Sequence, residues 1–325
     1  MKAIVYTKYG PPEVLQLKEI DKPTPKKDEV LVRVYATTVN RTDCATVRAK
    51  PFFMRLVTGL FRPHKSITGT DFAGKIESVG EDIISLKVGD KVFGFDDVGL
   101  ESHAEYLTLS EHEALLTLPE NMSYKQAAAS SEGTHYAYNF INKVNLERNQ
   151  RVLVNGATGA IGSAEVQLLK YFGANVTAVC ATKHIELVKS LGADKVIDYT
   201  KEDFTQDEQK YSFVFDTVGK SSFAKCKPIL ESGGVYISSE LDWMYQNLYY
   251  SFFTSFIGNK KVKFPVPVDI KRSLRLVKKL TVKGKFKAVI DREYTLEKIV
   301  DAFNYVESGQ KIGNVVITMK HDKKT

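Results

Sequence analysis

The alternation of apolar and polar positions changes twice along the chain. Up to about residue 122, short runs rich in β-branched residues are separated by turns containing Gly, Pro and Asp-Glu pairs. Such punctuated runs are typical of strands. They predict strands at Lys2–Tyr6, Val30–Ala36, Gly74–Val79 and Lys91–Gly94. The first segment therefore reads as a β-rich domain, expected to form a partly closed barrel.

A different period begins near Tyr124 and continues to about Val266. Here, continuous apolar runs such as Val-Leu-Val and Phe-Val-Phe alternate with helical stretches, which indicates a parallel sheet covered on both faces. The predicted strands are Arg151–Asn155, Asn175–Ala181, Lys195–Tyr199, Phe213–Thr217 and Val235–Ser239.

The last part of the chain returns to the first pattern. A helix is predicted at Ile270–Val282, followed by β and α pieces at Ala288–Ile290, Leu296–Glu307 and Asn314–Met319. We expect these pieces to complete the first domain. The prediction is an α/β protein with a discontinuous domain, 1–122 with 267–325, and an inserted α/β domain, 123–266.

Composition is ordinary for a globular protein of two domains, with 325 residues, 43% of them hydrophobic and 26% charged. The net charge of +7 could attract nucleic acid, anionic lipid or an anionic cofactor and selects none of them. A solvated basic face is the plainer interpretation, and the lysine-rich stretch 271–287 contains a single aromatic residue, Phe286. Binding of single-stranded nucleic acid needs interleaved aromatic residues, so we expect no nucleic-acid partner.

Three cysteines, Cys44, Cys180 and Cys226, lie far apart without CxxC spacing, which predicts neither a disulfide framework nor a structural zinc site. The first ten residues turn polar at once, and no apolar run reaches the roughly 20 residues of a membrane-spanning helix. We therefore expect a cytoplasmic protein without a leader peptide or a membrane span.

The sharpest local motif follows the predicted strand at 151–155. Glycines open a helix expected at Ile161–Phe172, which Gly173 should close as a left-handed cap. A helix that begins directly after a glycine turn offers free N–H groups and its positive dipole end to phosphates. The motif predicts a dinucleotide site with contacts from Gly156, Thr158, Gly159, Ala160, Ile161 and Gly162. A merely structural glycine turn is the alternative.

The end of the next strand indicates which dinucleotide is bound. Sites that prefer NAD carry an acidic residue about 20 residues after the glycines, to bind the ribose 2′-hydroxyl. Here the corresponding position is Ala181, followed by Thr182 and Lys183. Room, a hydroxyl and a positive charge suit a 2′-phosphate, so these residues favour NADPH. A solvated lysine at a strand end is the alternative.

Several further landmarks occur together and in order. They are Lys2-Ala-Ile-Val, Val39-Asn-Arg-Thr-Asp43, Gly69-Thr-Asp-Phe-Ala-Gly74, Val88-Gly-Asp-Lys-Val92, His103-Ala-Glu-Tyr-Leu107, Leu191-Gly-Ala-Asp194, Asp216-Thr-Val-Gly219 and Gly233-Gly234. With the glycine turn, they resemble the medium-chain dehydrogenase/reductase superfamily, and specifically its zinc-free quinone-oxidoreductase-like branch. The resemblance runs from Met1 to Met319.

The resemblance implies a GroES-like β-rich domain and a Rossmann domain, with the active site in the cleft between them. It also implies that Gly159, Gly162, Thr182, Lys183 and Tyr199 contact the dinucleotide. Asn40 and Thr134 would line the nicotinamide end, beside the strand-end turn at Val218 and Gly219. A homodimer is a further expectation of the family. For Asn40, a helix-capping role is the alternative.

Metal ligands of zinc-dependent relatives are missing at the matching positions. Asn40 stands in place of the first ligand, Thr70-Asp71 in place of a His-Glu pair, and Ser130 near the third. Zinc prefers nitrogen and sulfur ligands, so the resemblance implies no catalytic metal. The substrate should then already be electrophilic: a quinone, an enone or an enoyl thioester.

The chain also departs from several relatives, which place a tyrosine in the substrate pocket. No tyrosine occurs between Ala36 and Glu105, and Ala45, Phe52 and Phe53 occupy the neighbourhood instead. This leaves Thr42 and Asp43 as candidates for the proton donor, with Asn40 as the third candidate catalytic residue. Asp43 could equally be a buried hydrogen-bonding residue.

An aromatic segment, 243–256, could be core, a dimer surface or a wall of the substrate cleft. Together these observations predict a zinc-independent NADPH-dependent oxidoreductase that transfers hydride to a small electron-poor molecule. A non-catalytic NADPH-binding sensor and an enoyl-thioester reductase are the alternatives, because fold alone does not decide function.

Overall fold

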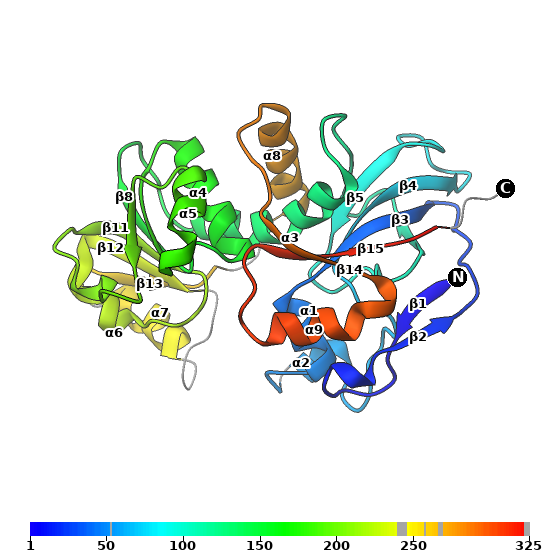
Figure 1. Cartoon of the computed structure of the whole chain (residues 1–325), viewed down its shortest axis with the longest axis horizontal. Coiled ribbons are helices and arrows are strands. Elements are labelled where there is room, and N and C mark those ends of the chain that lie inside the picture. Colours follow the sequence, from blue (N-terminus) through cyan, green and yellow to red (C-terminus); the bar gives the residue numbers. More distant parts are fainter. Residues whose placement is uncertain (53, 239–245, 257, 266–268, 322–325) are drawn as a thin grey trace. The chain divides into compact units, whose positions relative to one another are not determined.

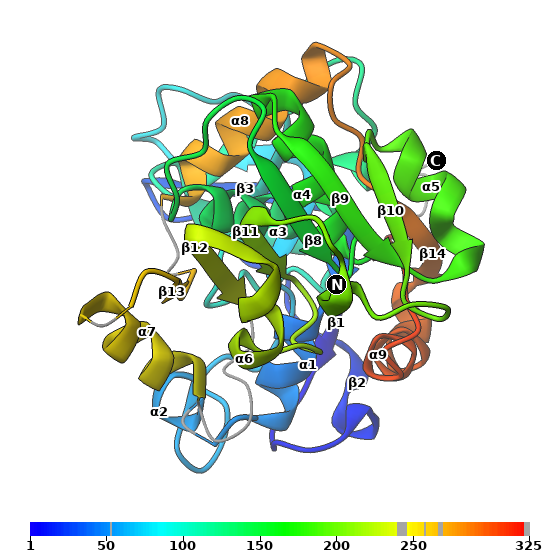
Figure 2. The same cartoon turned by 90° about the vertical axis from the view of Figure 1, so that its left-hand side faces the viewer.

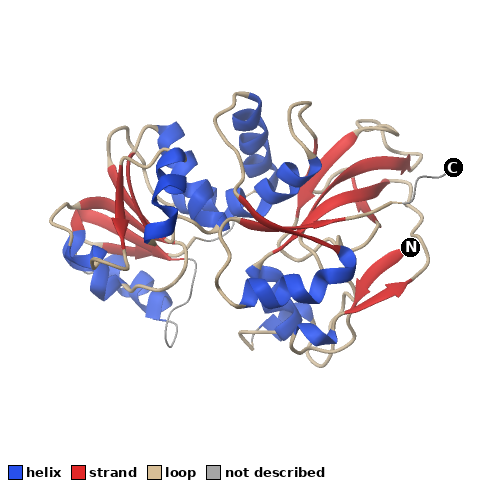
Figure 3. Ribbon diagram, in the orientation of Figure 1, coloured by secondary structure: helices blue, strands red, loops and turns tan. Residues whose placement is uncertain are grey.

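The computed structural model describes residues 1–52, 54–238, 246–256, 258–265 and 269–321. The chain divides into two compact units, Met1–Glu132 with Ile270–Thr325, and Gly133–Asp269 (Figure 1). The first boundary falls inside α3 (Tyr124–Ile141). The limits expected from the sequence, residues 122 and 266, lie slightly earlier in the chain. Each unit has its own sheet and helices (Figure 3).

The first unit is built on a seven-stranded sheet in the order β14-β15-β3-β4-β5-β7, with β6 paired to β3. Its strands are β3 (Glu29–Val39), β4 (Asp71–Val79), β5 (Lys91–Phe95), β6 (Tyr106–Ser110), β7 (Leu115–Thr117), β14 (Ile290–Thr295) and β15 (Asn314–Thr318). A separate hairpin contains β1 (Lys2–Val5) and β2 (Gln16–Glu19). The helices are α1 (Arg41–Arg48), α2 (Met54–Thr58), α8 (Ile270–Val282) and α9 (Ile299–Glu307).

The long strand β3 organises this unit because it pairs with β4, β6 and β15. Its β-branched residues Val30, Val32 and Val34 are completely buried in the hydrophobic core. The strand continues beyond the expected end at Ala36, since Thr37 and Thr38 pair with β15. These two buried threonines lead directly to α1.

The second unit is a six-stranded parallel sheet in the order β10-β9-β8-β11-β12-β13 (Figure 2). Its strands are β8 (Arg151–Asn155), β9 (Asn175–Cys180), β10 (Lys195–Asp198), β11 (Tyr211–Asp216), β12 (Leu230–Ser238) and β13 (Lys261–Lys263). The helices are α4 (Ala160–Phe172), α5 (Ile185–Ser190), α6 (Phe223–Cys226) and α7 (Gln246–Phe256). The strand order reverses between β8 and β11, where open α/β sheets bind ligands at the carboxyl ends of the strands.

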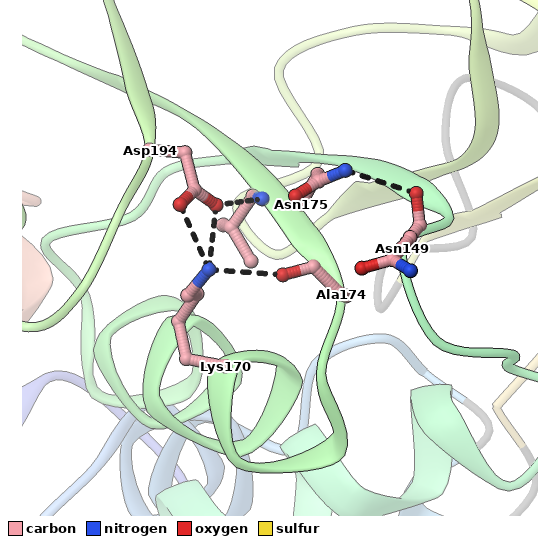
Figure 4. Close-up of polar contacts among 6 residues, drawn as sticks. Asn149, Lys170, Ala174, Asn175 and Asp194 are labelled. Atoms are coloured by element: carbon pink, nitrogen blue, oxygen red, sulfur yellow. Dashed lines mark hydrogen bonds and ion pairs between the residues drawn. The ribbon is translucent and has the colours of Figure 1, made fainter.

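A polar clamp holds α4 against the opposite, amino end of the sheet (Figure 4). Lys170 Nζ lies 2.7 Å from Asp194 Oδ2 and donates to the Ala174 carbonyl at 3.0 Å. The same Asp194 carboxylate accepts the backbone N–H of Val176, the second residue of β9, at 2.7 Å. The clamp gives Asp194, the last residue of the Leu191-Gly-Ala-Asp194 landmark, a structural role.

The expected α/β fold with a β-rich unit and a parallel-sheet unit is confirmed. Gly173 has φ 88° and ends α4, as predicted. The expectation for Ala288–Ile290 was wrong in extent, because β14 runs from Ile290 to Thr295 in parallel register with β15. Leu296–Glu307 begins with a 3-10 turn before α9.

In the aromatic segment, 243–245 and the Phe253 and Phe256 side chains lie outside the described structure. Tyr250 packs against Phe223 with ring centroids 5.6 Å apart, whereas Tyr249 is exposed. Cys44, Cys180 and Cys226 are all buried and unpaired. No described helix is both long enough and apolar enough to span a membrane.

Candidate active site and cofactor cradle

The predicted glycine turn lies at the reversal point of the parallel sheet. Gly156 follows β8 with φ 84°, a conformation that favours glycine. A Cβ atom on Gly162 would lie 2.2 Å from the Gly156 carbonyl oxygen, so the helix can approach the strand only without a side chain. At Gly159, the N-cap of α4, an added Cβ would meet no protein atom closer than 3.6 Å. The position of this Cβ at the start of α4 is therefore open, as the close approach of a phosphate requires.

Two neighbouring segments of the same unit border this turn. An added Cβ on Gly133 would lie 2.8 Å from the Ala160 carbonyl oxygen, which places the start of α4 against α3. The next residue, Thr134, has a buried hydroxyl without a hydrogen-bond partner among the described residues. A buried hydroxyl left without a partner is costly, and a bound polar ligand would supply one.

The turn after β11 lies on the other side of Gly156. A Cβ atom added to Gly156 would lie 2.4 Å from Val218 Cγ1 in this turn. The turn is held by Asp216, whose carboxylate accepts the N–H groups of Val218 and Gly219 at 3.3 and 3.0 Å. Asp216 also accepts the Asn155 side-chain amide at 3.0 Å, which ties β11 to β8.

The residues expected to recognise a 2′-phosphate lie at the ends of β9 and β10. These strands are parallel neighbours, with Cys180 opposite Asp198, so Ala181–Lys183 and Tyr199 follow at one sheet edge. Lys183 is exposed and makes no ion pair with the described residues, and Tyr199 is 60% exposed. The Thr182 hydroxyl, however, donates to the Asp198 carboxylate. The Thr182 hydroxyl could therefore donate a hydrogen bond to a 2′-phosphate, as expected, only by giving up this bond to Asp198.

The donor set of the second unit fits a dinucleotide phosphate. The unit offers a glycine-lined helix N-terminus after β8 and an exposed Lys183 after β9, and among the described residues the Thr134 hydroxyl has no hydrogen-bond partner and Lys183 no ion pair. The assignment of each predicted contact residue to the cofactor stays a prediction.

In the first unit, the candidate catalytic residues lie where β3 passes into α1. Asn40 is the N-cap of α1, and its backbone N–H donates to Asp43 Oδ2 at 2.8 Å. The Asn40 side-chain amide donates to Thr38 Oγ1 at 2.6 Å and to Asp71 Oδ2 at 3.4 Å. Asn40 and Asp43 are therefore both buried, hydrogen-bonded residues at the start of the helix, and their catalytic roles stay predictions.

The third candidate, Thr42, connects to a residue that the sequence did not single out. Its hydroxyl donates to Glu132 Oε1 at 2.7 Å, and Thr70 Oγ1 donates to Glu132 Oε2 at 3.2 Å. Glu132 is only 6% exposed. A carboxyl directly after the small residues 127–131 was the available signal, but its partners Thr42 and Thr70 lie far away in the sequence.

Glu132, Asp43 and Asp71 form a buried acidic cluster. Burial raises the pKa of Asp43 well above its usual range, and the nearby Glu132 carboxyl adds to this shift. Burial also raises the pKa of Asp71 to about 7, although hydrogen bonds from Thr38, Thr37 and Asn40 favour its charged form. The pKa of Glu132 is raised toward neutrality by burial and by Asp71. The cluster thus holds protons at a pH where isolated carboxyls have none.

Two further titratable residues lie near this acidic cluster, Lys311 and His103. Burial lowers the pKa of Lys311, while Glu132 partly opposes that shift. Burial lowers the pKa of His103 to about 4, so this ring is neutral and donates from Nε2 to the Thr38 carbonyl at 2.8 Å. Thr68 Oγ1 is 2.7 Å from the other ring nitrogen. The neutral His103 ring therefore joins the Thr38 carbonyl to the Thr68 hydroxyl.

A cavity in the first unit reaches this cluster. Its lining includes Tyr6, Asp43, Thr46, Thr68, Thr70 and Val98. The expected pocket residues Ala45 and Phe52 do not line it; Ala45 is half-buried in α1 and Phe52 is 70% exposed. Phe53 lies outside the described residues. Their role in substrate binding stays a prediction.

The side chains at the three positions that match zinc ligands in relatives form hydrogen bonds with other protein atoms. Asn40 and Thr70 are bound as described above, and Ser130 Oγ donates to the Gln126 carbonyl at 2.7 Å within α3. Within the described residues, no group of three or more His, Cys, Asp or Glu side chains has an arrangement that could hold a metal ion.

Comparisons with known proteins agree with this architecture. Residues 26–120 match the alcohol dehydrogenase GroES-like domain family, and residues 191–317 match the family described as zinc-binding dehydrogenase. The chain is 34% identical to 2-methylene-furan-3-one reductase of Solanum lycopersicum and 31% identical to NADPH-dependent alkenal/one oxidoreductase, chloroplastic, of Arabidopsis thaliana. Each alignment covers 98% of this chain and 79% of the relative.

Among solved structures, the quinone oxidoreductase from Coxiella burnetii superposes with a TM-score of 0.85 at 25% identity. The match covers 98% of this chain and 99% of that one. Fold, glycine turn and sequence relatives all lead to one assignment. The chain belongs to the medium-chain dehydrogenase/reductase superfamily, in its zinc-independent quinone-oxidoreductase-like branch.

Proposed function

We propose that the protein is an NADPH-dependent reductase of small electron-poor carbonyl compounds, with enones and quinones as its substrate class. The observation that carries this proposal is the glycine turn at the reversal point of the parallel sheet, with the exposed Lys183, which forms no ion pair with the described residues, at the strand end where a 2′-phosphate is expected. The alkenal/one and furanone reductase names of two relatives support it. When bound, the cofactor supplies a hydride.

The chain's own residues would bind and orient the reactants. Gly159 and Gly162 leave the N–H groups of α4 open to the pyrophosphate, and Lys183 adds a charge for the 2′-phosphate. Exclusion of water and correct placement account for much of the rate in such reactions, because the hydride chemistry belongs to the cofactor. Asp43 and the hydroxyls of Thr46, Thr68 and Thr70 supply polar groups to the cavity of the first unit.

The decisive experiment measures NADPH oxidation at 340 nm with a panel of quinones, enones and enoyl thioesters, each also offered with NADH. We expect turnover with enones or quinones and a preference for NADPH. Tight NADPH binding without turnover on any member of the panel would instead support a non-catalytic NADPH-binding protein. Turnover on thioesters alone would support the enoyl-thioester reductase.

A further inference from the structure

A chain of hydrogen bonds leads from the cavity of the first unit to a buried carboxyl. Thr70 lines the cavity, and its hydroxyl contacts Glu132 Oε2 at 3.2 Å. The other oxygen of Glu132 contacts the Thr42 hydroxyl at 2.7 Å. We propose that Glu132 stores the proton that the Thr70 hydroxyl delivers to the reduced substrate, an inference that rests on the proposed reductase function. Because it acts through Thr70, Glu132 is a positioning residue.

The partners of the three buried acids single out Glu132. Asp71 accepts the Thr38 backbone N–H at 2.8 Å, the Asn40 amide and the hydroxyls of Thr37 and Thr38, but neither of these threonines lines the cavity. Asp43 likewise accepts the backbone N–H of Asn40. Among the described residues, the hydrogen bonds of Glu132 come from the hydroxyls of Thr42 and Thr70, and Thr70 lines the cavity. A hydroxyl both donates and accepts, so its hydrogen bond to Glu132 can reverse direction when the carboxyl is protonated.

The charges that face Glu132 favour a bound proton before the reaction and stabilise the carboxylate after it. Asp71 at the start of β4, Asp97 after β5 and Asp43 in α1 all disfavour ionisation. Lys311, in the loop before β15, favours the ionised form. Burial and these carboxyls raise the pKa of Glu132 above its usual value, which keeps a proton available near neutral pH.

The proposed step balances for an enone. A hydride adds to the β-carbon and forms a C–H bond, and the electron pair of the C=C bond moves to give an enolate. The α-carbon then takes the Thr70 hydroxyl proton while the Glu132 carboxyl proton moves to the Thr70 oxygen. The substrate gains two electrons and two hydrogens, NADPH becomes NADP⁺, and the Glu132 carboxylate regains a proton from solvent.

The test is Glu132→Gln, which keeps the size of the side chain and removes its titratable proton. In the wild-type enzyme, kcat should fall as pH rises through the pKa of Glu132, because the proton donor is lost. In the variant, we expect kcat at pH 6.5 to fall by roughly 10- to 100-fold and the pH-dependent decline to disappear. The solvent deuterium isotope effect on kcat should change with it.

A matched pair at Thr70 covers the case in which Glu132→Gln does not fold. Thr70→Ser keeps the hydroxyl and should retain both the rate, within about threefold, and the pH profile. Thr70→Val keeps the shape, removes the hydroxyl and should reproduce the loss seen with Glu132→Gln. Thermal unfolding of all three variants separates this loss from a loss of structure.

A readout without turnover tests the stored proton directly. Infrared difference spectra of the protein without NADPH should show one buried carboxylic acid component that titrates near neutral pH in the wild type and is lost in Glu132→Gln, while the bands of the other buried acids, Asp43, Asp71 and Glu165, remain. An unchanged pH profile and rate in folded Glu132→Gln, or full activity of Thr70→Val, would overturn the inference. If the wild type reduces no quinone or enone, the proposed function fails instead, and the infrared band still decides whether Glu132 carries the proton.

Discussion

A Cβ atom on Gly162 would lie 2.2 Å from the carbonyl oxygen of Gly156, so no side chain fits between the end of β8 and the start of α4. Gly162→Val should push the helix away from the strand and abolish NADPH binding, because the N–H groups of α4 would no longer converge on the pyrophosphate. NADPH fluorescence titration measures this, with circular dichroism as the check on folding. A folded variant that binds normally would reduce the turn to a structural element.

Gly159 provides the matched control for that variant. An alanine there meets no protein atom within 3.6 Å, so Gly159→Ala should fold with nearly unchanged stability. Its methyl group points toward the space expected for the phosphates. We expect NADPH affinity to fall about tenfold, or about 1.4 kcal/mol.

Cofactor choice is predicted to depend on Lys183. NADPH should bind at least about tenfold tighter than NADH, and Lys183→Ala should remove most of that preference while leaving NADH binding unchanged. Lys189, which pairs with Glu186 on α5 at 3.2 Å, is a matched control. Lys189→Ala should leave the preference intact. Equal dissociation constants for both cofactors in the wild type would contradict the assignment.

Catalysis is expected to need no metal. Asn40, Thr70 and Ser130 offer only oxygen and amide groups, which already bond to protein atoms. Purified protein should contain less than about 0.1 zinc per chain, and activity should survive chelation. Simple alcohols should not be oxidised, because no bound zinc lowers their pKa. Stoichiometric zinc, with activity lost on chelation and restored by zinc alone, is the opposing result.

Glu165 should make the second unit less stable as pH rises. The side chain is fully buried in α4, and both carboxyl oxygens are without partners among the described residues. Burial raises the pKa of Glu165 well above its usual value. Between the unfolded and folded pKa values, only the folded state holds the proton, so the free energy of unfolding falls as pH increases.

Glu165→Leu should therefore raise the free energy of unfolding at pH 8 by about 1–3 kcal/mol and flatten its pH dependence. Denaturant unfolding between pH 5 and 8 measures both effects. Glu165→Gln removes the titration alone, so it should flatten the curve and gain less stability. A variant less stable than the wild type at pH 8 would refute this account.

Local signals sufficed for much of the fold. The strand Arg151–Asn155 and the helix Ile270–Val282 were predicted at their observed bounds, because each combines a clear hydrophobic period with strong end signals. The limits of β14 were missed since its polar sequence, Ile290–Thr295, forms a strand only by pairing with β15. Pairing of distant segments leaves no mark on the local pattern.

In the candidate site too, local motifs could be predicted and contacts between distant segments could not. The glycine turn could be located from spacing alone because the motif is contiguous. The contact between Thr42 and Glu132 joins residues 90 positions apart and depends on how α1 and α3 pack in the first unit. The sequence likewise suggested that Thr182 donates a hydrogen bond to the 2′-phosphate. It could not reveal that this hydroxyl is bound to Asp198, because that bond depends on the pairing of β9 with β10.

The burial of all three cysteines has a consequence for the reductase of enones and quinones proposed above. Such compounds arylate and alkylate thiolates, and the thiolate is the reactive form of cysteine. Burial raises the pKa of Cys180 to about 11 and that of Cys226 to about 12, and it raises the pKa of Cys44 as well. At neutral pH all three sulfurs stay protonated and out of reach. The protein is thereby protected from covalent modification of its cysteines by the electrophilic substrates that it is proposed to reduce.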